Sequence, residues 1–158
     1  KEALKLELAE FRQLLQQLMQ EGFNGYIVLM VQGLQGIEEG ILVFKNGQPV
    51  GCYHELMKLN HVFYSDRALN AFLNASAARK GIIDVFRLDL QQVDLVLSFN
   101  EKIKLSEAMK SEFPKKINEL PLKEFSSSFI QEALQALPAE DKLTKTELMK
   151  KLGLEGMD

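Results

Sequence analysis

The chain has 158 residues, of which 46% are apolar and 26% charged, with a formal net charge of −3 and a single cysteine. This length fits one compact domain, and the composition excludes an intrinsically disordered chain. The acidic balance disfavours nucleic acid as the main partner, because phosphate contacts need dense Lys and Arg. A lone cysteine cannot form an internal disulfide, and no apolar run is long enough to span a bilayer, so we expect a cytoplasmic protein.

The first segment predicts an amphipathic helix over residues 2–21. Leucine and phenylalanine recur there every three or four residues, with Glu and Gln between them. Gly22 ends the pattern, as glycine commonly does after a helix. The polar face is acidic and amide-rich, whereas a membrane-surface helix carries Lys and Arg, so we expect this helix to pack on a sheet.

Residues 25–54 predict a three-stranded antiparallel meander. Runs rich in β-branched residues cover 26–31, 40–45 and 48–53. Asn46-Gly47 stands between the second and third runs. This dipeptide favours a type I′ hairpin turn, because both central residues of that turn need positive φ.

Helical and strand patterns alternate in the next part of the chain. Ser65 is the expected N-cap of a helix whose apolar stripe runs to Leu73. Residues 81–88 predict a strand that could join the meander. Residues 89–99 fit a strand by alternation or a helix by the capping-box pair Asp89 and Gln92, and we choose the helix.

Beyond residue 100 the pattern is helical and more polar. Residues 127–137 predict a helix, and residues 144–147 form a capping box before an apolar stripe that ends at Gly153. The sequence therefore predicts an α+β fold, an antiparallel meander sheet of four to five strands packed by helices, with a helical C-terminal region. We divide it into an α+β sheet domain at residues 1–104 and a helical extension at residues 105–158.

The side chains best suited to chemistry are Cys52, His54 and His61. Their spacing lacks the CxxC and HxxxH patterns of zinc sites, so we predict no metal and no cofactor. A Cys52 nucleophile would need a base brought to it by the fold. Glu38 and Glu39 are expected in a solvated bend, since adjacent carboxylates in a strand point to opposite faces. We therefore predict that the protein is not an enzyme.

The segment between the third strand and the Ser65 helix is the best candidate contact surface. It is rich in apolar and aromatic residues, and connections that expose such groups often contact a partner. The alternative is that these side chains fill the gap between helix and sheet. The candidate partner or ligand contacts are Tyr53, His54, Glu55, His61, Phe63 and Tyr64.

The order of turns and strands also resembles a known pattern. It comprises the strand from Gly25 to Val28, the hairpin from Glu39 to Val50, the helix at 68–73 and the strand from Gly81 to Phe86. Residues 20–100 resemble an archaeal domain family of unknown function, related to the PatA N-terminal-like domains of bacterial signalling proteins. The resemblance implies a non-enzymatic module and transfers no catalytic residues.

These observations together predict a non-catalytic protein-interaction or regulatory module. A protein is the expected partner, whereas nucleic acid and membrane are not, and the chain could form a homodimer through a sheet edge or an apolar helix face. The alternative is a small-ligand or metal-binding domain that uses the region from Cys52 to His61. Stoichiometric zinc in protein purified without an affinity tag would favour that alternative.

Overall fold

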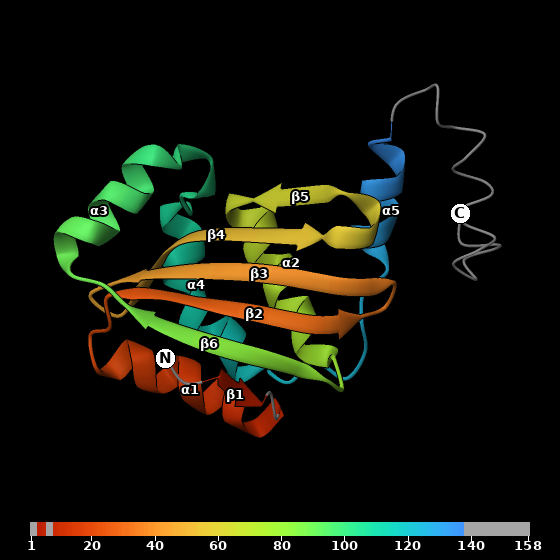
Figure 1. The fold of residues 1–158 in the computed structure, drawn as a ribbon. Coiled ribbons are helices and arrows are strands. Elements are labelled where there is room, and N and C mark those ends of the chain that lie inside the picture. The colour runs from red at the N-terminus through yellow and green to blue at the C-terminus, as the bar shows by residue number, and fades with distance from the viewer. Residues whose placement is uncertain (1–2, 6–7, 138–158) are drawn as a thin grey trace. The chain divides into compact units, whose positions relative to one another are not determined.

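The computed structural model describes residues 3–5 and 8–137, and its contacts divide the chain into two compact units, Lys1–Phe125 and Ser126–Asp158. The described part of the first unit holds a six-stranded sheet in the order β1-β6-β2-β3-β4-β5 (Figure 1), and all neighbouring pairs are antiparallel. The predicted α+β fold is therefore confirmed. The strands are β1 (Ala3–Lys5), β2 (Gly25–Gly33), β3 (Gly36–Lys45), β4 (Gln48–Leu56), β5 (His61–Tyr64) and β6 (Gly81–Arg87).

The helices of the first unit are α1 (Leu8–Gln20), α2 (Ser65–Asn74), α3 (Leu90–Phe99) and α4 (Glu107–Asn118). Short 3-10 helices are η1 (Met57–Leu59), η2 (Ala75–Ala77) and η3 (Glu101–Ile103).

The second unit contains α5 (Ser128–Gln135), which confirms the helix predicted at 127–137. The helix predicted after residue 144 lies outside the described residues. The predicted division into two domains at residue 104 stays a prediction. Helix α4, which follows that boundary in the sequence, belongs to the first compact unit.

The helix predicted over residues 2–21 starts later than its pattern suggested. Ala3–Lys5 forms the edge strand β1, which pairs with residues 82–84 of β6, and α1 begins at Leu8. Local helical preference over one turn is weak, and tertiary pairing readily overrides it. Gly22, with φ of 64°, follows the helix as predicted.

The Asn46-Gly47 turn forms the predicted hairpin, with φ of 51° and 77° at its two residues. The Gly47 N–H donates a hydrogen bond of 2.9 Å to the carbonyl of Phe23, and a Cβ at Gly47 would overlap the Met19 carbonyl oxygen. Beyond the turn the register shifts, because Phe44 pairs with Pro49 but Val43 pairs with Gly51. Val50 is the extra residue, so this hairpin contains a β-bulge.

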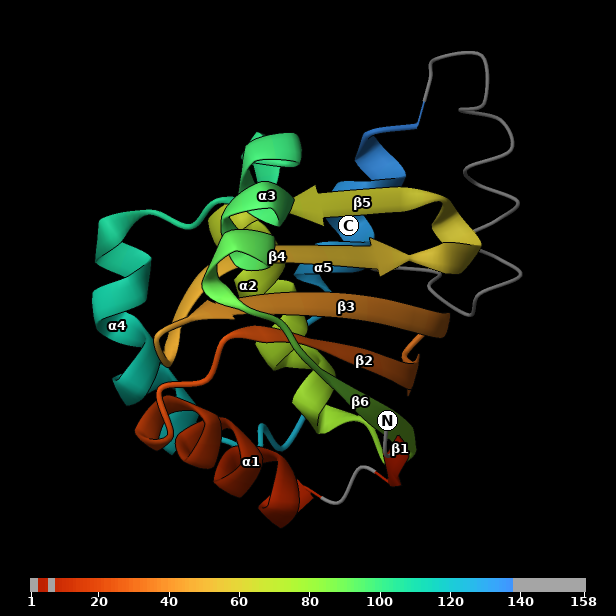
Figure 2. The same ribbon diagram turned by 60° about the vertical axis from the view of Figure 1, so that its left-hand side comes forward.

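Helices α1, α2 and α4 contribute the core on one face of the sheet, while α3 lies on the other face. Figure 2 shows α2 behind the strands and α3 in front of them at one end. Aromatic rings join the elements of this core: Phe11 of α1 meets Phe72 of α2 at 5.9 Å, and Phe44 of β3 meets Phe113 of α4 at 6.3 Å. All four rings are buried.

The aromatic segment predicted as a connection is strand instead. β4 extends to Leu56, η1 reverses the chain at Asn60 with φ of 48°, and β5 pairs back on β4. The Ser65 side chain does not cap α2, as the sequence suggested, but donates a hydrogen bond to the carbonyl of Lys104. The helix chosen for residues 89–99 is confirmed, with the capping box of Asp89 and Gln92 in place.

Candidate functional site

We call the face of the sheet opposite α1, α2 and α4 the open sheet face. Side chains alternate between the two faces along each strand, so the registers assign the members of this face. Ring contacts on the same face support the assignment, since Tyr26 stacks on Phe86 at 4.8 Å and Tyr53 meets Tyr64 at 6.0 Å. The open sheet face comprises Tyr26, Val28, Met30, Gln32, Ile37, Glu39, Ile41, Val43, Tyr53, Glu55, Val62, Tyr64, Ile82, Asp84 and Phe86.

Helix α3 covers one end of the open sheet face. Its Val93 is fully buried in a cluster with Val43 and Ile103, and Tyr26 and Ile41 pack against that cluster. An ion pair between Lys45 and Asp94, at 2.6 Å, links α3 to β3. At this end, α3 therefore shields the open sheet face from solvent.

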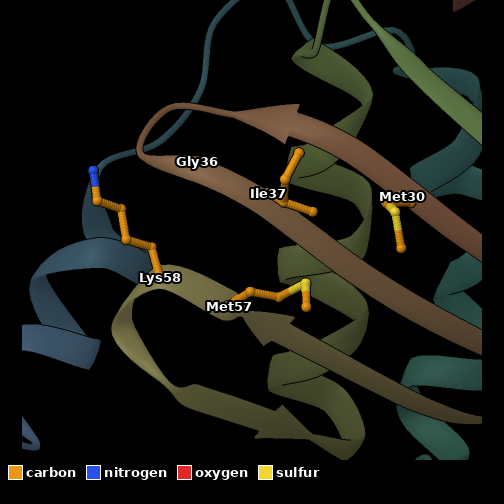
Figure 3. A pocket seen from close by; sticks show the side chains of 5 residues that line it. All are labelled: Met30, Gly36, Ile37, Met57 and Lys58. Carbon is orange, nitrogen blue, oxygen red and sulfur yellow. The ribbon is translucent and has the colours of Figure 1, made fainter.

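The other end of the open sheet face keeps a shallow apolar hollow of about 570 Å³. Ile37 and Met57 are 40% and 45% exposed there, and Ile82 on the neighbouring β6 is 46% exposed. Thioether side chains are flexible and adapt to partners of different shape. Figure 3 shows the side chains of this methionine hollow, which we define as Met30, Gly36, Ile37, Met57 and Lys58.

Carboxylates lie among the apolar residues of the open sheet face. Glu39 and Glu55 stand directly opposite each other on β3 and β4. Like charges in that position destabilise a strand pair. On β6, the Oδ1 atom of Asp84 is buried and has no hydrogen-bond partner among the described residues. This surface is therefore both apolar and negatively charged.

The pKa of Tyr53 reflects both its burial and the carboxylate beside it. Burial, followed by the hydrogen bond of 2.9 Å that the phenol donates to Glu55 and the charge of that carboxylate, raises the pKa of Tyr53 to about 12. The unfolded chain loses this proton near pH 10. The resulting stability is thus complete below pH 10 and falls as the pH rises from 10 to about 12.

We expect the Tyr53→Phe variant to lose less stability than the wild-type protein across that alkaline range. Thermal unfolding followed by circular dichroism at a series of pH values measures the difference. Parallel declines in the two proteins would contradict the assigned role of Tyr53.

On the opposite face, Glu38 and His54 form a buried pair. The Nε2 atom of His54 lies 2.8 Å from Oε2 of Glu38, and both residues are buried. The prediction of a solvated bend is therefore wrong for both glutamates, which lie inside β3 on opposite faces, with Glu38 facing the core and Glu39 partly buried on the open sheet face. Gly33 makes room for its carboxylate, because a Cβ there would overlap Oε1. The Nδ1 atom of His54 has no hydrogen-bond partner among the described residues.

The structure divides the six candidate contacts between the two faces. Tyr53, Glu55 and Tyr64 share the open sheet face, where Tyr64 is 41% exposed. His54 and Phe63 are buried on the core side, and His61, beside Phe63 at 4.7 Å, is partly buried. Met57 lies in the segment that the sequence predicted as a contact surface, whereas Met30, Ile37 and Ile82 were missed as surface residues. The signal that could have found them is strand alternation, continued through the whole of each strand.

Cys52 is fully buried, and burial raises the pKa of its thiol far above the ordinary value. A nucleophilic cysteine needs the opposite environment, with a lowered pKa and solvent access. Within residues 3–5 and 8–137, no group of three or more His, Cys, Asp or Glu side chains could hold a metal ion. None of the helices in the described part of the chain is long and apolar enough to cross a membrane.

Comparison with known proteins places the chain in a family. Residues 2–100 match the family model described as "Uncharacterized protein conserved in archaea (DUF2226)", and this range includes the whole sheet together with α1, α2 and α3. No curated protein and no solved structure matches the chain. The match covers more than half of the sequence and confirms the archaeal family expected from the order of strands, so the chain belongs to the archaeal family DUF2226.

Proposed function

We propose that the domain is a non-catalytic protein-interaction module that binds a partner protein through the open sheet face. The observation that carries this proposal is the uneven cover of the sheet. Helices bury the core face, whereas half of the open sheet face keeps Ile37 and Ile82 40% and 46% exposed, and Met57 of the adjoining η1 is 45% exposed. Antiparallel sheets that face water usually alternate apolar and polar side chains, and this face departs from that pattern.

The continuity of the exposed residues supports a contact surface. Single exposed apolar residues are normal, but a contiguous patch on one face marks an interaction site. Met30 pairs directly with Ile82 across β2 and β6, and Met30 and Ile37 both line the methionine hollow. Apolar side chains from β6, β2 and β3 therefore lie next to one another on this part of the face.

The proposal assigns no catalysis because two of the three side chains best suited to it are in the core. Cys52 and His54 are fully buried, and the hydrogen bond of the imidazole within the described residues goes to Glu38. A cytoplasmic location and the relation to PatA N-terminal-like domains belong to the same proposal and rest on the sequence alone. Dimerisation through a sheet edge is less favoured than a face contact, since β5 is only four residues long and short edge strands limit pairing.

Charged substitutions on the open sheet face test this function. Ile37→Lys and Ile82→Lys are each expected to weaken binding to the partner at least tenfold, since each places a hydrated ammonium in an apolar contact; a tenfold loss corresponds to about 1.4 kcal/mol. The partner is isolated from native extract with the wild-type protein, purified, and titrated by calorimetry against each variant.

Leu90→Lys is the matched control, because Leu90 is equally exposed, at 44%, but lies at the start of α3. It is expected to bind like the wild-type protein. Thermal unfolding checks that all three variants remain folded. Partner binding that is unchanged in both Ile37→Lys and Ile82→Lys would refute the proposed surface.

A further inference from the structure

The open sheet face already binds one helix. Val93 and the neighbouring apolar residues of α3 pack on Tyr26, Ile41 and Val43, which belong to β2 and β3. The same two strands continue beyond α3 with Val28, Met30 and Ile37. Apolar side chains of the kind that hold α3 therefore continue into the uncovered half, where Glu39, Glu55 and Asp84 lie among them.

The ends and edges of the sheet favour a helix over a strand as the occupant. A peptide that adds a strand needs a long free sheet edge. The two edge strands are β1 with three residues and β5 with four. The exposed apolar surface lies on the face instead, where ridges of a helix can enter the methionine hollow.

The charges of this surface define the chemistry of the partner. Glu39 and Glu55 oppose each other, and Asp84 lies on the same face two strands away from Glu39. Lys58 is the one cation that lines the methionine hollow, and in Figure 3 its ammonium points away from Met30 and Ile37. A bound cation would relieve the repulsion between the two glutamates.

The same charges argue against a second copy of this chain as the occupant. A symmetric dimer through the open sheet face would place the same surface of both copies together. Glu39, Glu55 and Asp84 of one copy would then face the same three carboxylates of the other. Facing charges of the same sign suppress such a pairing.

We propose that the uncovered half of the open sheet face binds an amphipathic helix of another protein, one that combines an apolar ridge with flanking Lys or Arg residues. This inference rests on the proposed function and specifies the partner. The apolar ridge enters the methionine hollow, and the basic residues meet Glu39, Glu55 and Asp84. Electrostatic attraction of this kind sets specificity and association rate more than total affinity.

Selection from a displayed library of helix-forming peptides tests the inference. The wild-type domain is expected to enrich peptides with an apolar ridge and Lys or Arg beside it. Synthetic peptides from that pool are expected to bind at least tenfold more tightly than copies in which each Lys or Arg is replaced by Glu, a ratio worth about 1.4 kcal/mol. Fluorescence anisotropy measures both affinities, and the ratio should shrink at high salt because screening weakens charge attraction.

A charge-reversed domain provides the decisive comparison. The double variant Glu39→Lys with Glu55→Lys is expected to prefer the acidic copies of the peptides. The matched control, Glu112→Lys with Glu119→Lys, changes the net charge equally on exposed residues at α4 and should keep the wild-type preference. Thermal unfolding verifies that both double variants are folded.

Each other outcome overturns a defined part of the argument. Enriched peptides without a charge preference, but sensitive to Ile37→Lys, overturn the basic partner and leave the proposed function standing. An empty selection, or peptides insensitive to Ile37→Lys, overturns the helical occupant, while the calorimetric test decides the proposed function separately. A dimer that Ile37→Lys dissociates in sedimentation equilibrium overturns the inference in favour of self-association.

Discussion

Replacing Phe72 with alanine is expected to lower the free energy of unfolding by about 3–5 kcal/mol. Phe72 lies in α2 and is fully buried between the helix layer and the sheet. Its ring contacts Phe11 of α1 at 5.9 Å and lies against Gly40, where a Cβ would come within 2.5 Å of the ring. The substitution removes the free energy gained by burying the ring, and it also leaves a cavity that the rigid strand cannot fill. The two costs add.

Urea denaturation followed by circular dichroism measures the loss, with Phe99→Ala as the matched control. Phe99 is 81% exposed at the end of α3, so the same deletion there should cost less than about 1 kcal/mol. If the Phe72→Ala variant does not fold, Phe72→Leu keeps most of the volume and remains measurable. A loss at residue 72 no larger than that at residue 99 would contradict the packing described here.

Breaking the buried pair of Glu38 and His54 is expected to have a comparable effect. Glu38→Leu should destabilise the domain by about 3–5 kcal/mol, because it leaves the imidazole buried without its partner. Removing both polar groups, in Glu38→Leu with His54→Leu, should recover much of that loss, since replacement of a whole buried pair by apolar residues is often neutral. The two single variants and the double variant form a cycle that measures the coupling between the side chains.

The neighbouring glutamate supplies the control for that cycle. Glu39 lies next to Glu38 in sequence but on the open sheet face, opposite Glu55. Glu39→Leu should therefore change stability by less than about 1 kcal/mol, and removal of the like-charge pair could raise it. Additive effects of the Glu38 and His54 substitutions would show that the 2.8 Å contact contributes nothing to stability.

Local signals were enough to predict much of the fold. The Asn46-Gly47 turn and the runs on both sides of it predicted the hairpin, and the Asp89 capping box decided correctly between helix and strand for residues 89–99. These features depend on residues close in sequence. By contrast, β1 depends on pairing with a strand almost 80 residues away, and its own residues continue the helical pattern of α1.

The candidate site could be predicted only in part, for a reason that lies in the bulge. Counted from the turn without interruption, His54 would pair with Glu39. The extra residue, Val50, shifts the register so that His54 pairs with Gly40, and Glu38 becomes its neighbour on the core face. No turn dipeptide marks this shift. Treating residues 53–64 as a connection also hid the alternation that separates Tyr53 and Glu55 from His54.

The bulge at Val50 also affects how the length of this chain can vary. Phe44 pairs with Pro49 and Val43 pairs with Gly51, so the loss of Val50 alone would bring these pairs next to each other and remove the bulge. The rest of β4 would keep its register, with Cys52 and His54 facing the core and Tyr53 and Glu55 on the open sheet face. The bulge is therefore a position inside the sheet where the chain can lose one residue without exchanging the interior and the contact surface, whereas the Leu34-Gln35 tip lies outside both strands that it joins.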